Sequence, residues 1–119
     1  MLVIRDEQMG AFREAALCRW IVQSLEGCYP ERARAQAAGL YGLVRDAVRE
    51  ARANGFQGDH DLRRYVHLVF VLGLDFPGRL PWAVRVLKDA GLDRPAARLA
   101  ALEQACATHL ASTEAAGGR

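Results

Sequence analysis

The sequence lacks long apolar segments, strand-like alternation and a secretion leader. Its most apolar stretch, residues 65–74, is bracketed by Arg64 and Asp75, and it is too short for a bilayer, which needs about 20 apolar residues. No segment alternates apolar and polar residues as a half-buried strand does. Residues 1–7 have no basic leader followed by a long apolar core. We therefore expect no membrane span, no signal peptide and a cytoplasmic location.

Lysine is almost absent, because Lys88 is the only lysine among the 16 Lys and Arg residues. The 14 Asp and Glu residues reduce the formal net charge to +2. The arginines are scattered among these acids along the sequence, whereas nucleic-acid binders concentrate positive charge on one surface. We therefore expect no nucleic-acid partner.

The three cysteines, Cys18, Cys28 and Cys106, are an odd number without a Cys-x-x-Cys spacing. This pattern favours a reducing compartment and small, inert, buried thiols. Cys106 and His109 share a helix face at i, i+3, but no second pair could complete the four ligands of a structural zinc ion. We expect no metal site.

Catalytic patterns are missing as well. The serines lie outside any Gly-x-Ser-x-Gly context, and the glycines are single helix stops that form no phosphate-binding loop. Adjacent carboxylates occur at residues 6–7 and 59/61, where helix starts explain them. We expect no catalytic residue, no cofactor and no enzymatic activity.

Helical periodicity dominates the chain, so we predict an all-α, compact, single-domain bundle of about five helices over residues 1–111. The Gly/Ala/Ser-rich residues 112–119 are expected to form a flexible tail. The expected helices cover residues 6–27, 36–54, 59–72, 81–89 and 94–111, with a short helical turn at 31–35.

The helix at about 60–72 is predicted to be the central one, because residues 68–72 are apolar all round. Asp59 is its expected N-cap and Gly73 its stop. Asn54 and Gly55 are expected to stop the preceding helix, after which Phe56 folds back as an apolar contact. His67 is expected at the edge of the core, hydrogen-bonded to backbone or water.

The loop at residues 75–82 is the least ordinary segment. Pro77 and Gly78 suit the central positions of a type II turn, and Asp75 could pair with Arg79. Phe76 and Trp82 either close the core or contact a partner. The candidate partner-binding residues are Phe76, Arg79, Leu80, Trp82, Arg85 and Val86.

Several segments together resemble a family of small helical proteins encoded beside type VI secretion toxin cassettes, near PAAR proteins and effector adaptors. The segments are residues 4–9 (Ile-Arg-Asp-Glu-Gln-Met) with Phe12, 29–32 (Tyr-Pro-Glu-Arg), 43–45 (Leu-Val-Arg), 51–56 (Ala-Arg-Ala-Asn-Gly-Phe), 72–73 (Leu-Gly), 75–76 (Asp-Phe) and 80–82 (Leu-Pro-Trp).

The resemblance implies an accessory role: a co-chaperone or adaptor that holds a secreted effector, a PAAR protein or an effector chaperone before export. An immunity protein that inhibits a cognate toxin domain is the alternative. An enzyme with an unrecognised site and a small homo-oligomeric bundle are further alternatives, and the oligomeric state stays open.

Overall fold

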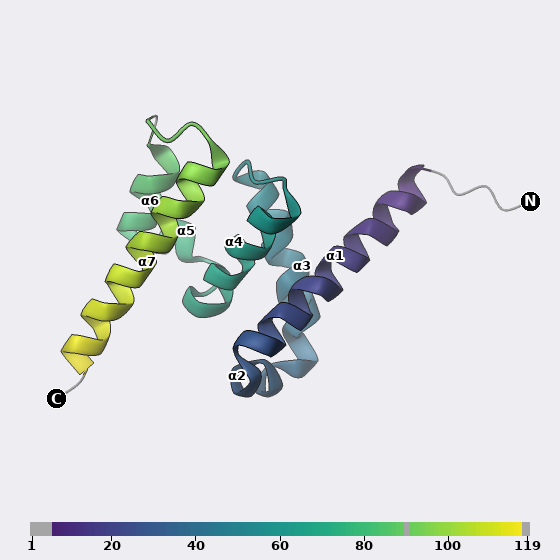
Figure 1. The fold of residues 1–119 in the computed structure, drawn as a ribbon, viewed down its shortest axis with the longest axis horizontal. Coiled ribbons are helices and arrows are strands. Elements are labelled where there is room, and N and C mark those ends of the chain that lie inside the picture. Colours follow the sequence, from purple (N-terminus) through teal and green to yellow (C-terminus); the bar gives the residue numbers. More distant parts are fainter. Residues whose placement is uncertain (1–5, 90, 118–119) are drawn as a thin grey trace, which may run out of the picture.

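The computed structural model describes residues 6–89 and 91–117, and helices are the only regular secondary structure in these residues. They are α1 (Asp6–Cys28), α2 (Pro30–Ala35), α3 (Ala37–Ala53), α4 (Asp59–Leu72), α5 (Phe76–Arg79), α6 (Pro81–Lys88) and α7 (Pro95–Gly117), as Figure 1 shows. The predicted all-α fold is confirmed. The expected count of about five was too low, because α2 and α5 are separate short helices.

Helix α4 is central, as its apolar sequence predicted. It packs against α1, α3 and α7, and Leu62, Val66, Leu68 and Val69 on it are buried. Helix α6 packs against α5 and α7. Helix α4 therefore joins the α1–α3 part of the molecule to the α5–α7 part.

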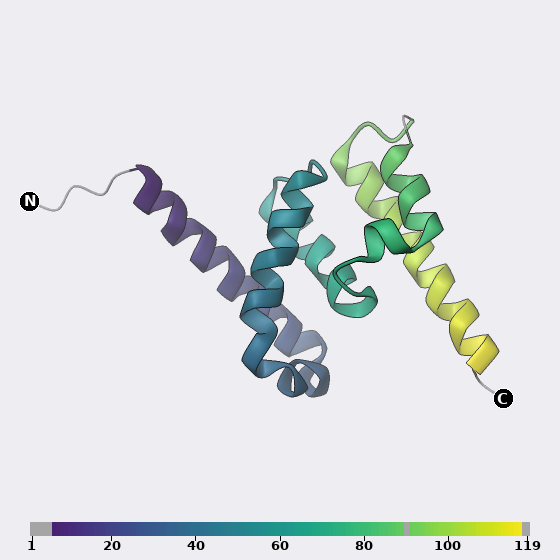
Figure 2. The ribbon, with the colours of Figure 1, turned by 180° about the vertical axis from the view of Figure 1, so that it is seen from behind.

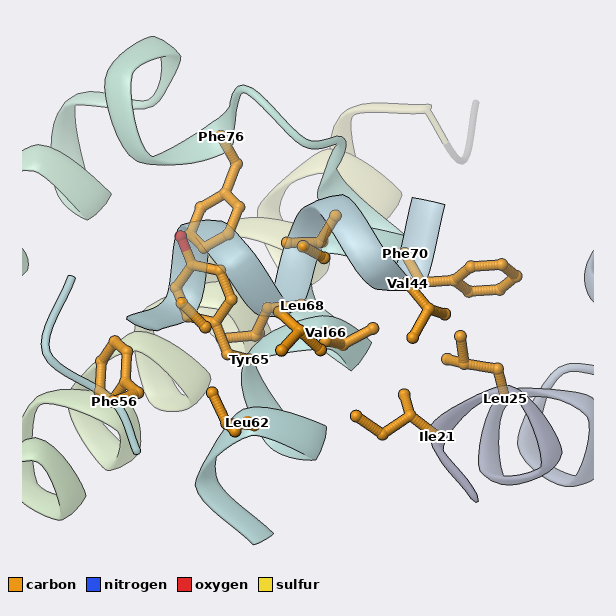
Figure 3. Close-up of a cluster of buried hydrophobic side chains, with 14 of the residues drawn as sticks. Ile21, Leu25, Val44, Phe56, Leu62, Tyr65, Val66, Leu68, Phe70 and Phe76 are labelled. Carbon is orange, nitrogen blue, oxygen red and sulfur yellow. The ribbon is translucent and has the colours of Figure 1, made fainter. Parts of the chain in front are cut away.

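An aromatic row forms the middle of the core (Figure 3). The Tyr65 ring of α4 lies with its centroid 5.4 Å from that of Phe56 and 5.4 Å from that of Phe76, and all three side chains are fully buried. The Tyr65 hydroxyl donates a hydrogen bond to Glu50 Oε1 (3.3 Å) and accepts one from Asn54 Nδ2 (3.3 Å). These bonds satisfy the phenol inside the core and join α4 to the end of α3.

Glycine ends α3 and α4 at the two predicted positions. Gly55 has φ 94° and Gly73 has φ 104°, a left-handed conformation that glycine adopts without a Cβ clash. Behind Gly55, the Phe56 amide donates to the Ala51 carbonyl (3.0 Å), and the buried Phe56 ring makes the predicted apolar contact.

Two local predictions were wrong. The N-cap of α4 is Gly58, and Asp59 lies in the first helical turn without a side-chain capping bond. Pro77 and Gly78 form no type II turn, because they lie inside α5 and Gly78 has no positive φ. Proline is compatible with the first turn of a helix, and the Leu80 amide closes this turn on the Phe76 carbonyl (3.1 Å).

The molecule is elongated, with extents of 65 × 37 × 19 Å. Helices α1 and α7 have 23 residues each and diverge on either side of α4 (Figures 1 and 2). Helix α7 reaches Gly117, beyond the end expected at residue 111. The single domain over 1–111 and the flexibility of the tail stay predictions.

Candidate functional site

The most distinctive surface feature is a cleft of about 430 Å³ between α1, α4 and α7. Its floor comes from α4 and its walls from the end of α1, the α1–α2 junction and α7. The lining residues are Ser24, Cys28, Tyr29, Arg63, Arg64, His67, Leu68, Val71, Glu103, Cys106, Ala107 and Leu110.

Each of the three helices presents residues at helical spacing to this cleft. Helix α1 contributes Ser24 and Cys28 at i, i+4; α4 contributes His67 and Val71 at the same spacing; and α7 contributes 103, 107 and 110 at i, i+4, i+7. Residues three and four apart lie side by side on one face of a helix. The cleft is therefore bounded by three helix faces that lack a packing partner on this side.

A hydrogen bond between side chains crosses the cleft wall. Ser24 Oγ of α1 lies 2.9 Å from His67 Nε2 of α4, and the His67 ring also contacts the Tyr29 ring at 5.8 Å. Burial, with a smaller contribution from the Arg63 charge, lowers the pKa of His67. The imidazole is therefore neutral near pH 7. His67 lies at the edge of the core as predicted, but its partner is a side-chain hydroxyl.

An ion pair joins α4 to α7 at the side of the same cleft. The Arg64 guanidinium contacts both carboxylate oxygens of Glu103, with Nε 3.2 Å from each, and its Nη1 lies 3.6 Å from Asp61 Oδ1. The charge of Glu103 opposes the lowering of the His67 pKa, and it is the smallest of the three effects. The Glu103 carboxylate is bound by Arg64. The Ser24–His67 pair is thus not extended to the orienting acid that a serine-nucleophile triad uses.

The three cysteines differ in burial. Cys18 and Cys106 are buried, and burial raises the pKa of both. Cys28 is exposed, so the expectation that all three thiols are buried was wrong for this residue, which lies at the last turn of α1. Across the described residues, no group of three or more His, Cys, Asp or Glu side chains could hold a metal ion.

The residues predicted to bind a partner do not form one exposed groove. Phe76 is fully buried against Tyr65, so its ring packs in the core and is not exposed to a partner in this structure. Leu80, Trp82 and Val86 are partly buried and pack against the core, and the Trp82 indole nitrogen is buried without a hydrogen-bond partner in the described part of the chain.

The two arginines of that set differ in what they contact. Arg79 and Arg85 are both exposed. Arg79 binds Asp75 as predicted, with Nε 3.3 Å from Oδ1, and its Nη2 donates to the Leu72 carbonyl (2.5 Å). Arg79 therefore connects the end of α5 to Asp75 and to the end of α4.

A second, more polar hollow of about 550 Å³ lies between α1, α3 and the start of α4. Arg13, Trp20, Arg52 and Asp59 line it. Arg52 Nη1 donates to both carboxylate oxygens of Glu14, at 2.7 and 2.6 Å. This ion pair joins α1 to α3. Because Glu14 neutralises the Arg52 charge, the hollow is less suited to an anionic ligand.

Comparisons with known proteins give no relative. No family model matches the chain, and neither a curated protein nor a solved structure does. Within residues 6–89 and 91–117, no helix is long and apolar enough to cross a membrane.

Sequence reasoning missed the cleft, although one signal for it was present. His67 is a polar residue inside an otherwise apolar helix, and it lies one turn before Val71 on the same face. A polar group at such a position marks an edge where the helix is not fully covered. The approach of α7 to this edge depends on tertiary packing, which the sequence pattern does not contain.

Proposed function

We propose that this chain is a non-enzymatic protein-interaction module, an adaptor or co-chaperone that holds a type VI secretion effector or its loading protein before export. The resemblance described above supports the secretion context, and it implies action in the cytoplasm, where effectors are loaded. The single observation that supports a binding role is the cleft between α1, α4 and α7.

The cleft suits an amphipathic helix of the partner. Val71 and Leu110 offer apolar surface, and Leu110 is 38% exposed. Burying apolar surface contributes roughly 25 cal/mol per Å². Ser24 and Ala107 are small, so a guest helix can approach α1 and α7 closely. A helix laid into a groove by its apolar face is a recurrent mode of peptide recognition.

Polar groups at the rim would set the orientation of the guest. Arg63 lines the cleft while its guanidinium lies over the Trp20 ring, 5.0 Å from the centroid. A guest carboxylate or carbonyl could accept hydrogen bonds from its N–H donors. The Ser24–His67 bond and the Arg64–Glu103 pair hold the three walls in place, so we assign them a structural role.

Co-expression with the products of neighbouring secretion genes tests the proposal. The chain should co-purify with a PAAR protein or an effector chaperone, and Leu110→Asp should abolish co-purification because it places a charge on the apolar wall. Thr108→Asp is the matched control: Thr108 is exposed on α7 and lies on the side of the helix away from Leu110.

Two results would contradict the adaptor role. Equal co-purification of the Leu110→Asp and Thr108→Asp variants, both folded by circular dichroism, would remove the cleft as the binding site. Rescue of cells that express the bare toxin domain, with no binding to PAAR or chaperone proteins, would establish the immunity role in its place.

A further inference from the structure

Four exposed side chains form one stripe along α3. Tyr41, Arg45, Arg49 and Arg52 follow each other at i, i+4, i+8 and i+11, which on an α-helix places them on one face over about 16 Å. Tyr41 is 42% exposed, and the side chains of Arg45 and Arg52 are 55% and 43% exposed. Helix α3 thus brings three of the arginines onto one surface together with Tyr41. We call these four residues, Tyr41, Arg45, Arg49 and Arg52, the α3 stripe.

Helix α3, which carries the stripe, lies on the opposite side of α4 from the cleft. The buried side of α3, with Leu40, Val44 and Val48, packs on α1 and α4. Helix α4 meets α3 through Tyr65, whereas His67 and Val71 lie on the other side of α4 and line the cleft. Helix α3 accordingly lies behind α4 in Figure 1 and in front of it in Figure 2.

The middle of the α3 stripe has positive charge that the described residues neutralise only weakly. Arg52 is occupied by Glu14, but Arg45 makes only a 3.9 Å contact, through Nε, with the exposed Asp46. Arg49 is exposed, and no acidic partner for it occurs in the described residues. Each guanidinium has five N–H donors in a planar fork that matches a carboxylate.

We propose that the α3 stripe binds an acidic amphipathic helix of a protein partner, with Asp or Glu side chains facing Arg45 and Arg49 and an apolar side chain against the Tyr41 ring. Charge complementarity carries this inference, because two one-turn-spaced guanidinium groups match carboxylates spaced i, i+4 on a helix. Exposed Tyr and Arg are also the residue types that dominate binding energy at protein interfaces.

Acidic side chains beside the stripe favour a protein partner over a nucleic acid. Asp46 adjoins Arg45, and Glu14 holds Arg52, so a continuous phosphate backbone would meet carboxylates on both flanks. Nucleic-acid binding depends on an uninterrupted basic surface. Two acids at i, i+4 on a partner helix are spaced about 6 Å apart, like Arg45 and Arg49, and can pair with these two arginines alone.

This inference goes beyond the proposed function and does not depend on it. An adaptor needs two surfaces if it is to join two proteins, and the cleft and the α3 stripe share no residue. Substitutions in the cleft leave the stripe intact, and substitutions in the stripe leave the cleft intact. Failure of one proposal can therefore be distinguished from failure of the other.

The test titrates the isotope-labelled full chain with a synthetic helical peptide that carries Glu at i, i+4 and i+7 and one Leu. The same peptide with Gln in place of Glu and a short duplex DNA are the comparison ligands. We expect amide shifts centred on α3, at least about tenfold tighter binding of the Glu peptide than of the Gln peptide, and weakening by added salt.

The variant Arg45→Glu/Arg49→Glu should lose at least about tenfold in affinity for the Glu peptide. The control is Arg34→Glu/Arg94→Glu, which changes the net charge equally at exposed positions outside the stripe and should bind like the parent chain. Equal binding of the Glu and Gln peptides, equal affinity of the two double variants, tighter binding of the DNA, or shifts centred on the cleft would each overturn the inference.

Discussion

Ser24 Oγ and His67 Nε2 lie 2.9 Å apart and join α1 to α4 at the wall of the cleft. Because burial lowers the pKa of His67, the unfolded chain binds a proton at this residue more readily than the folded chain does. The free energy of unfolding therefore falls as the pH drops below about 6.5, the ordinary pKa of histidine. Above that pH the contribution of this residue is constant.

The first prediction concerns this pH dependence. His67→Gln keeps a hydrogen-bonding side chain next to Ser24 but removes the titration, so its stability should fall less than that of the parent chain between pH 7 and pH 5. Urea unfolding of both proteins across this range measures the difference. His60→Gln is the control, since His60 is exposed. If the stability of the parent chain and of His67→Gln changed with pH in parallel, His67 would not be the source of the pH dependence.

The second prediction concerns Glu50, whose pKa is raised chiefly by burial although Tyr65 donates a hydrogen bond to it. A raised carboxyl pKa means that the folded state binds the proton more tightly, so this group reduces stability as the pH rises above its unfolded pKa. Glu50→Gln retains an oxygen that accepts the Tyr65 bond and removes the partly buried charge. It should raise the melting temperature at pH 7 and lose this advantage at pH 4.

Exposed Glu26 offers the control for that measurement, because Glu26→Gln makes the same chemical change on the surface. If Glu26→Gln and Glu50→Gln shift the melting temperature at pH 7 equally, desolvation of Glu50 is not the cause.

The third prediction compares Gly73, which ends α4, with Gly78, five residues later inside α5. A Cβ at Gly73 would sit at φ 104° and 3.2 Å from Asp75 Oδ1, whereas at Gly78 it would meet nothing within 4 Å. Gly73→Ala should therefore destabilise the chain by about 1–2 kcal/mol, and Gly78→Ala should be neutral or stabilise it by up to about 1 kcal/mol. Chemical denaturation of the two variants decides; a strongly destabilised Gly78→Ala would reinstate the type II turn.

This pair of glycines also shows why the sequence predicted one stop correctly and the neighbouring turn wrongly. Gly73 ends a long periodic run, and that signal is local. Pro77 and Gly78 are compatible both with a type II turn and with a short helix, and the packing of Phe76 on Tyr65 selects the helix. The deciding contact joins residues that the local pattern does not connect.

The same distinction applies to the candidate site. The long helices and the central position of α4 follow from periodicity and from the apolar residues 68–72. The loop set Phe76, Leu80, Trp82 and Val86 was singled out for its unusual composition, but the core accounts for these side chains. The cleft arises from the divergence of α1 and α7 around α4, which no stretch of sequence specifies.

The fourth prediction separates the floor of the cleft from the core beneath it. Sequence alone predicts that Asp at either Leu68 or Val71 abolishes folding, because both are apolar residues of the central helix. In the structure Leu68 is only 7% exposed, whereas Val71 is partly exposed at the cleft. Burying an unpaired charge is far more unfavourable than placing one at a solvated edge.

Leu68→Asp should therefore give an unfolded chain, with no cooperative thermal transition by circular dichroism. Val71→Asp should remain folded, melt cooperatively at a reduced temperature and fail to bind the partner helix, because the charge lies where the guest would pack. Val66→Asp, at a fully buried position of α4, should behave like Leu68→Asp. A Val71→Asp variant as unfolded as the other two would mean that the cleft is closed in solution and that its floor belongs to the core.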